Sequence, residues 1–355
     1  MVRQPKRASK RKPRAVDLFC GAGGLSEGLR QAGYKVIGAV DRDPLACRTY
    51  RLNHKGATTW RVDIRRLSGA ALMKALKLKP GELDLLAACP PCQGFSAMRT
   101  RNGSRRNRDP RNELISDVLR MVRSIKPASF MLENVPGLAS SRRYAAFRRS
   151  LEALGYHVNG EILNAIDYAV PQRRRRLVLL ASKLGEPGFA PEARRRWTVR
   201  HSIGALPPPE RSADPIHNYE VHRSEKVQSL IRRIPRDGGS RRALGLHNQL
   251  RCHKRFHGFN DVYGRMAWDR AAPTITSGCI NPSRGRFLHP SAHRAITLRE
   301  AALLQTFPKG YRFHWDENRY ALAALIGNAL PPEFIRRHAK ALREACLRRV
   351  NNNAV

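Results

Sequence analysis

Between residues 15 and 182, short apolar runs of strand length alternate with amphipathic stretches of helical length. The predicted strands occupy residues 15–19, 35–40, 83–88, 128–132, 158–163 and 177–181. The predicted helices occupy residues 25–32, 43–54 and 113–125. Alternation of this kind is typical of parallel strands with helices on both faces of the sheet. We therefore predict an α/β fold with a Rossmann-like, doubly wound and mostly parallel sheet.

This alternation stops after Ser182. Residues 185–290 are rich in Pro, Gly, Arg and His and contain one predicted helix, at 224–234, before helical spacing returns at 297–307, 319–326 and 332–350. The predicted organisation is a disordered basic arm at 1–14, an α/β domain at 15–184, a smaller irregular domain at 185–290, and helices at 291–355 that return to the first domain.

The chain carries a large positive charge. Its 355 residues include 67 Lys and Arg against 28 Asp and Glu, which gives a net charge of +39. Seven of these cations lie in the first fourteen residues, and removing them leaves +32 on the rest. Such an excess indicates a polyanionic partner, because each phosphate contact releases counterions. An Arg-rich codon bias is the alternative, and charge alone leaves both open.

Sequence features relevant to the cellular compartment are few. No apolar stretch approaches the roughly 20 residues that span a bilayer, and no apolar segment follows the basic N-terminus as in a signal peptide. Seven cysteines, an odd number, do not indicate a disulfide framework. We expect no membrane association and a reducing compartment, the cytoplasm, with the protein associated with the nucleoid if the source is a prokaryote.

A glycine-rich turn follows the first predicted strand. Residues 17–24 read Asp-Leu-Phe-Cys-Gly-Ala-Gly-Gly, which differs from the G-x-G-x-x-G spacing that binds pyrophosphate. Asp41 ends the next predicted strand and Asp63 follows a later one, where carboxylates are placed to hold ribose hydroxyls. This pattern predicts a nucleoside site without a demand for phosphates, as S-adenosylmethionine needs. A turn required only for packing is the alternative.

A second motif, Cys-Pro-Pro-Cys-Gln-Gly-Phe-Ser at residues 89–96, follows the predicted strand 83–88. Ligands bind at the carboxyl ends of strands in open parallel sheets. Three interpretations compete: a redox pair, half of a zinc site, or a single nucleophilic Cys92 on a proline-stiffened loop. The zinc site needs a second cysteine pair, which the sequence lacks, so we predict no metal. The redox pair needs a thioredoxin-type context instead of a preceding nucleoside site.

Two further motifs have value only through their position. Glu133-Asn134-Val135 closes the predicted strand 128–132, at the same sheet edge as Cys92, although an acid at such a place is usually a helix cap. Residues 171–176, Pro-Gln-Arg-Arg-Arg-Arg, lead into the strand 177–181 and alone would indicate a solvated basic run.

Taken in order, these motifs resemble those of the prokaryotic-type DNA (cytosine-5)-methyltransferase family over nearly the whole chain. The similar motifs are its cofactor loop (17–24), nucleophile loop (90–93), acid motif (133–135), Gln-x-Arg-x-Arg pattern (172–176), late supporting helix (Arg299, Glu300, Gln305) and closing motif (327–331). The resemblance implies a class I methyltransferase fold, S-adenosylmethionine as methyl donor with S-adenosylhomocysteine as product, and double-stranded DNA as partner. It also implies that 185–290 is a target-recognition domain.

The resemblance assigns roles to individual residues. It makes Cys92, not Cys89, the nucleophile, Glu133 the acid, and Arg174 and Arg176 further catalytic residues. The implied cofactor-binding residues are Asp17, Phe19, Gly21, Gly23, Asp41, Asp63, Ile64, Pro90, Leu114 and Asn328. The implied nucleic-acid contacts are Gln93, Ser96, Gln172, Thr274 and Ile275. Arg42 departs from the pattern, because many relatives place a bulky apolar residue there, against the adenine.

The implied chemistry explains these residue types. Addition of the Cys92 thiolate to C6 of cytosine turns C5 into a nucleophile, and a proton from buried Glu133 to N3 assists that addition. Either Arg174 or Arg176 would favour the thiolate. The cytosine must leave the duplex, at a cost of a few kcal/mol. We expect a monomer, with a cognate restriction endonuclease as a candidate partner; the alternatives are tRNA methylation and a non-catalytic DNA-binding relative.

Overall fold

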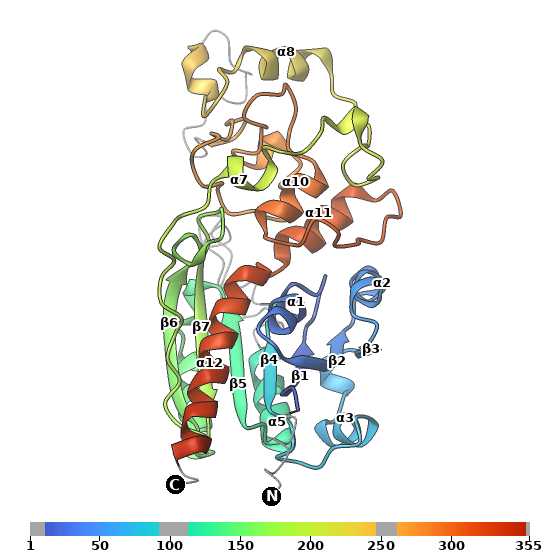
Figure 1. The fold of residues 1–355 in the computed structure, drawn as a ribbon. Helices are drawn as coiled ribbons and strands as arrows, with labels where there is room; N and C mark the ends of the chain where they lie inside the picture. The colour runs from blue at the N-terminus through green and yellow to red at the C-terminus, as the bar shows by residue number, and fades with distance from the viewer. Residues whose placement is uncertain (1–10, 92–112, 246–260, 353–355) are drawn as a thin grey trace, which may run out of the picture.

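The central element of the fold is a seven-stranded sheet with the order β3-β2-β1-β4-β5-β7-β6 (Figure 1). The computed structural model describes residues 11–91, 113–245 and 261–352. The strands are β1 (Arg14–Leu18), β2 (Lys35–Asp41), β3 (Thr58–Arg61), β4 (Leu85–Ala88), β5 (Ser129–Asn134), β6 (His157–Asn164) and β7 (Arg175–Ser182). The predicted doubly wound, mostly parallel sheet is confirmed.

One strand of this sheet, β7, runs opposite to the other six. Strands β1 to β5 pair in parallel, so their carboxyl ends meet at one edge, whereas β7 runs antiparallel to both of its neighbours, β5 and β6. The connection between β6 and β7, residues 165–174, is shorter than the dozen or so residues that a parallel crossover needs. The antiparallel pair therefore follows from the short connection.

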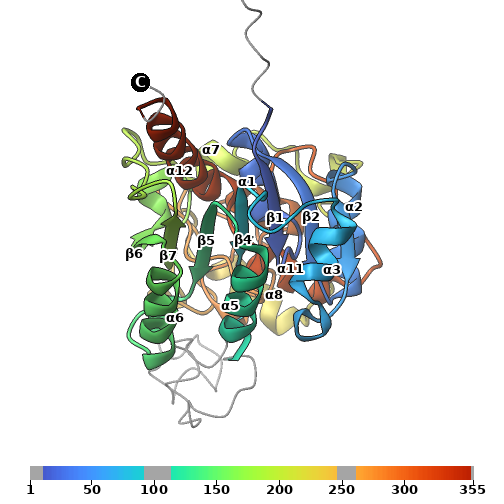
Figure 2. The same cartoon turned by 90° about the horizontal axis from the view of Figure 1, so that it is seen from below.

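Helices cover both faces of the sheet (Figure 2). On one face lie α1 (Gly24–Gln31) and α12 (Pro332–Asn352), and on the other α3 (Gly69–Ala75), α5 (Leu114–Ile125) and α6 (Arg142–Ala153). Strand β4 shows how one strand serves both layers. Leu85 and Ala87 belong to the core beneath α1 and α12, while Leu86 and Ala88 belong to the core beneath α5. A strand with apolar residues on both sides is typical of a central parallel strand.

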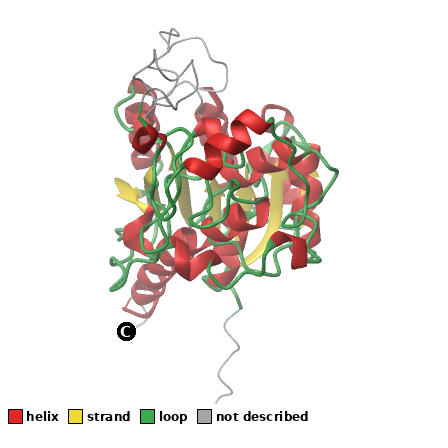
Figure 3. Cartoon of the chain, turned by 90° about the horizontal axis from the view of Figure 1, so that it is seen from above, coloured by secondary structure: helices red, strands yellow, loops and turns green. Residues whose placement is uncertain are grey.

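A second region lies above the carboxyl ends of the strands and consists mainly of loops (Figure 3). Its core unites α7 (Val199–Ile203), α10 (Leu298–Leu304) and α11 (Arg319–Asn328) with side chains such as Met266 and Phe287. The outer helix α8 (Glu225–Arg233) packs on a smaller cluster. Of the helices after residue 291, α12 packs on the sheet, whereas α10 and α11 belong to this second core.

The N-terminal boundary also differs from the prediction. Residues 1–10 lie outside the described part of the chain, but Arg11 donates to the Asp84 carboxylate over 2.8 Å. The backbone N–H of Arg14 donates to the same carboxylate over 2.7 Å, and β1 begins at Arg14. Residues 11–14 are therefore attached to the sheet and do not belong to a disordered arm.

Membrane-spanning helices and clustered metal ligands are both absent from the described residues. No described helix combines the length and the apolar character that crossing a bilayer requires. Within the same residues, no group of three or more His, Cys, Asp or Glu side chains has an arrangement that would hold a metal ion.

Candidate active site

A cavity of about 1050 Å³ lies where the carboxyl ends of the strands meet the second region. The predicted site residues that line it are Phe19, Gly21, Asp41, Asp63, Ile64, Pro90, Leu114, Glu133, Arg174, Arg176, Thr274, Ile275 and Asn328. Asp17, Gly23 and Gln172 are described but do not line it, and Cys92, Gln93 and Ser96 lie outside the described residues. One cavity thus brings together most of the motifs that the sequence singled out.

The two central glycines of the turn between β1 and α1 have different surroundings. Both adopt positive φ, +51° at Gly21 and +88° at Gly23. A Cβ on Gly21 would meet no atom of the described residues within 4 Å, whereas one on Gly23 would clash with the Tyr311 hydroxyl and lie 2.7 Å from Nε2 of His54. Gly21 therefore leaves cavity space open to a ligand, and Gly23 permits tight packing.

Carboxylates of β2 and the segment after β3 form one wall of the cavity. The Asp41 carboxylate accepts from the backbone N–H of Gly21 over 2.8 Å, and burial raises its pKa above the usual range. The Asp63 carboxylate accepts from the Arg65 guanidinium over 2.6 Å, which holds its pKa well below the usual range. Arg42 lies 3.7 Å from Asp63, so this atypical residue faces the cavity beside an acid.

Asp17 lies behind the glycine turn rather than at the cavity. Its carboxylate is fully buried and accepts from the Ser26 hydroxyl over 2.6 Å, and that hydroxyl also contacts the Tyr50 hydroxyl over 2.8 Å. Burial raises the pKa of Asp17 to about 7. In this structure Asp17 connects β1 to α1 and α2 (Pro44–Asn53), although the sequence predicted a cofactor contact.

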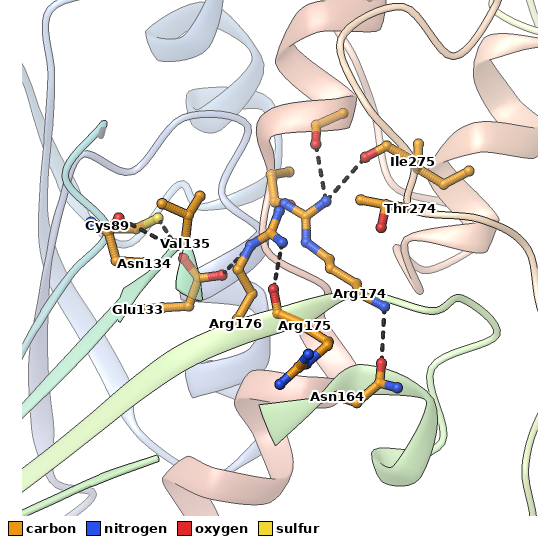
Figure 4. Close-up of polar contacts among 12 residues, drawn as sticks. Cys89, Glu133, Asn134, Val135, Asn164, Arg174, Arg175, Arg176, Thr274 and Ile275 are labelled. Atoms are coloured by element: carbon orange, nitrogen blue, oxygen red, sulfur yellow. Dashed lines mark hydrogen bonds and ion pairs between the residues drawn. The ribbon is translucent and has the colours of Figure 1, made fainter. Parts of the chain in front are cut away.

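Glu133 is the second-to-last residue of β5 and is enclosed by neighbours on both sides (Figure 4). Its side chain is 2% exposed. The Cys89 thiol, just beyond β4, donates to Oε2 over 3.1 Å, and Nε of Arg176 lies 3.0 Å from Oε1 as an ion pair. Next to Glu133, the Asn134 amide donates to the backbone oxygen of Pro90 over 3.0 Å. Strand β5 therefore holds the start of the Pro-Pro-Cys loop.

The two arginines on β7 and the segment before it differ in their contacts. Arg174 is 3% exposed, and its guanidinium donates to the backbone oxygens of Ile275, Gly327 and Ala329 over 3.0–3.3 Å (Figure 4). Burial lowers the pKa of Arg174 to about 9. Arg174 therefore joins the sheet to the second region and to the end of α11, while Arg176 contacts the predicted acid.

The Gln172 side chain is buried and connects neighbouring segments of the chain. It is fully buried, and its amide donates to the backbone oxygen of Leu304 and to Oε1 of Gln305. Its own Oε1 accepts from the backbone N–H of Ile275 over 3.1 Å. The predicted DNA contact is thus corrected for this structure, because a fully enclosed side chain orients Ile275 and does not face a ligand.

Some cavity residues were not assigned a role from the sequence. Cys89 contacts Glu133, and Arg284 lines the wall on the side of the second region. The contact of Cys89 with Glu133 could have been predicted only from the register of β4 with β5, in which Ala88 lies opposite Leu132. For Arg284 no local signal distinguishes it from the many other arginines of residues 185–290.

Comparisons with known proteins agree along the chain. The model of the family described as C-5 cytosine-specific DNA methylase matches residues 14–344. The Type II methylase M.HgiDII of Herpetosiphon aurantiacus is 36% identical over 346 residues, covering 92% of this chain and 94% of that protein. The Type II methyltransferase M.XorII of Xanthomonas oryzae is 33% identical over 363 residues, covering 92% and 83%.

A solved structure extends the likeness to the fold. The S. pombe Dnmt2 methyltransferase is 21% identical, with a TM-score of 0.59, and the alignment covers 94% of this chain and 99% of that one. The similarity therefore includes the sheet domain, the loop-rich second region and the C-terminal helices together.

Proposed function

Because the chain belongs to the C-5 cytosine-specific DNA methylase family, we propose that its cavity holds S-adenosylmethionine beside a cytosine swung out of a specific duplex DNA sequence. The chain is a DNA (cytosine-5)-methyltransferase, and the finer proposal is that C5 receives the methyl group through a covalent bond between Cys92 and C6. One observation carries this proposal: Glu133, the glycine turn and Thr274–Ile275 line a single cavity.

The cavity fits an adenosyl cofactor. Gly21 leaves open space at the turn, Asp41 offers a carboxylate for ribose hydroxyls, and Phe19 with Ile64 and Leu114 supplies apolar surface for an adenine ring. When bound there, S-adenosylmethionine supplies an electrophilic methyl group on a sulfonium. Apolar walls with a few placed polar groups are typical of such ligand sites.

The reacting base would be handled by Cys92 and Glu133. The Cys92 thiolate forms a bond to C6, Glu133 gives a proton to N3, and the ring electrons move to C5, which then attacks the methyl group. A base then removes the C5 proton, and the electrons of that C–H bond form the C5–C6 double bond. The bond between Cys92 and C6 breaks to release the thiolate, and the N3 proton returns to the Glu133 carboxylate. The contact of Asn134 with Pro90 supports this assignment, because it fixes Pro90, two positions before Cys92 in the sequence, beside the residue that follows the acid.

The DNA would lie against the second region. The net charge of +32 beyond the first fourteen residues favours phosphate contacts, and Arg side chains of 185–290 are suited to guanine edges in the major groove. Thr274, next to the cavity, would contact the displaced strand, whereas Ile275 is fully buried and would support Thr274 from the core. We propose that a monomer acts on double-stranded DNA, with a cognate restriction endonuclease as a candidate companion.

Methylation mapping tests the proposal. The protein is incubated with S-adenosylmethionine and either duplex plasmid DNA or tRNA, and 5-methylcytosine is mapped after bisulfite treatment. We expect methylation of DNA within one short sequence context and none by Cys92→Ser. Methylation of tRNA alone would replace the DNA proposal, and no transfer to either polymer would favour a non-catalytic relative. The presence of both Cys92 and Glu133 disfavours that last alternative.

A further inference from the structure

Two residues leave neighbouring parallel strands side by side at the floor of the cavity. In the pairing of β4 with β5, Ala88 lies opposite Leu132, so the next residues, Cys89 and Glu133, emerge together at the carboxyl edge. The Cys89 thiol lies 3.1 Å from Oε2 of Glu133, and both residues line the cavity. This contact is outside the roles that the nucleophile and the acid themselves require.

The direction of the hydrogen bond follows from the surroundings of the thiol. Burial and the neighbouring Glu133 carboxylate raise the pKa of Cys89 well above its usual range. The thiol therefore keeps its proton at neutral pH and donates it to the carboxylate. Two further charged groups face this pair. Arg176 on β7 lies 3.0 Å from Oε1 of Glu133, and Arg174, just before β7, interacts electrostatically with both Glu133 and Cys89.

The two oxygens of Glu133 have different described neighbours: Oε2 accepts a hydrogen bond from Cys89, whereas Oε1 forms an ion pair with Arg176 and has no hydrogen bond among the described residues (Figure 4). The terminal torsion of a glutamate is broad and only weakly restricted by itself. A buried oxygen that loses its donor is also left without a partner. Without the Cys89 donor, the Glu133 carboxylate would therefore be free to rotate away from the orientation in which it can transfer a proton to the target cytosine.

We infer that Cys89 is a positioning residue, whose thiol orients the Glu133 side chain for proton transfer to the target base. The inference rests on the proposed function. It gives the two cysteines of the Cys-Pro-Pro-Cys motif separate roles, because Cys89 retains its proton and orients the acid, while Cys92 loses its proton and attacks the ring. A residue that only fills space beside Glu133 would not need a polar hydrogen.

The test compares two replacements of Cys89 under single-turnover conditions. Cys89→Ala removes the donor, and Cys89→Ser keeps one in a similar volume. We expect the alanine variant to lower the methyl-transfer rate about tenfold, the effect of one lost hydrogen bond, with KM for DNA and for S-adenosylmethionine within about twofold. The serine variant should stay near the wild-type rate.

Recovery of the rate in Cys89→Ser is the readout that a packing role would not give, because serine restores a hydrogen-bond donor beside Glu133. Cys279→Ala is the matched control for loss of a buried thiol, because Cys279 is fully buried in the core of the second region. If Cys89→Ala does not fold, Cys89→Val removes the donor without leaving a void.

Equal methyl-transfer rates for the alanine and serine variants would overturn the inference, as would a change in thermal midpoint or KM without a change in rate. Failure of the proposed function has a different signature. In that case the wild-type protein transfers no methyl group, or Cys92→Ser remains active. An active wild type, an inactive Cys92→Ser and an unchanged Cys89→Ala would refute the positioning role alone.

Discussion

The sheet domain and the loop-rich second region satisfy their buried backbone groups by different means. In the sheet, strands pair with one another between two helical layers, and the side chains of the core are almost all apolar. In the second region, arginine side chains take the place of strand partners. Arg265 is fully buried and donates to four backbone oxygens, those of Ile231, Ile234, His289 and Ala292.

This difference shows that some of the positive charge has a structural role. Buried carbonyl oxygens need donors, and one guanidinium offers five N–H groups. Arg286 provides a further example, with bonds to the backbone oxygens of Gly238, Gly239 and Arg265. Burial lowers the pKa of Arg265 to about 10, which still leaves it charged at neutral pH. Part of the arginine excess therefore holds loops together and is not available to phosphate.

The largest effect is expected when Arg265 is replaced by Met. Four buried carbonyl oxygens lose a shared donor, so the free energy of unfolding should fall by about 3–5 kcal/mol. Hydrogen exchange should rise in residues 230–245 and 261–292 while the sheet strands stay protected. Arg233→Met, at an exposed position on α8, serves as control. Equal stability of the two variants would mean that arginines do not support the second region.

On the sheet side, the buried carboxylate of Asp17 predicts an unusual pH dependence. Its pKa is raised from 3.8 to about 7 by burial, so the folded state binds the proton more tightly than the unfolded chain. The wild-type protein therefore loses stability as pH rises from about 4 through 7. Asp17→Asn removes this loss, and its advantage over wild type should grow by about 2–3 kcal/mol between pH 5 and 8. Urea unfolding at both pH values measures it, and a constant difference would contradict the assignment.

The two glycines of the turn should separate folding from ligand binding. Gly23→Ala introduces a clash with Tyr311 and His54 in a left-handed conformation, so a loss of about 2 kcal/mol in stability is expected. Gly21→Ala meets open space and should lose about 1 kcal/mol, with weaker binding of S-adenosylmethionine. Thermal unfolding and calorimetric titration of both variants measure this. Weaker binding by Gly23→Ala alone would reverse the assignment.

The smallest effect is expected for Asp269→Asn. The ion pair of Asp269 with Arg200 spans 2.7 Å in the second region, but both side chains are more than half exposed. Exposed pairs of this kind contribute little, because water and salt screen them. We expect no resolvable change in the thermal midpoint. A clear decrease would show that exposed arginine pairs also support the second region.

The sequence was most informative where local pattern decides the structure. Predicted strands lie within a few residues of β1, β2, β4, β5, β6 and β7, because apolar runs bounded by glycine and charge are a local signal. The class I methyltransferase fold implied by the motifs is confirmed. Helix α6 was not predicted, since its many arginines obscure the apolar spacing of Tyr144, Phe147 and Leu151.

Long-range contacts account for the rest. The Pro-Gln-Arg-Arg-Arg-Arg segment has the composition of a solvated run, yet Gln172 and Arg174 are buried. Their partners lie more than 100 positions away in the sequence, at Gln305, Ile275 and Gly327. No local sequence pattern therefore predicts that Gln172 and Arg174 are buried. The loop predicted to hold the cofactor lies at the cavity, but whether each of its residues faces the cavity or the core depends on packing from α2 and residues near Tyr311.

Trapping of the covalent bond between Cys92 and the target base tests the central claim most directly. Duplex DNA carrying 5-fluorocytosine at the mapped site is incubated with the protein and S-adenosylmethionine, and the products are resolved on a denaturing gel. Because fluorine cannot leave as the C5 proton does, a stable protein–DNA adduct is expected with wild type and none with Cys92→Ser. Methylation of normal DNA without any adduct on the fluorinated duplex would contradict the covalent mechanism.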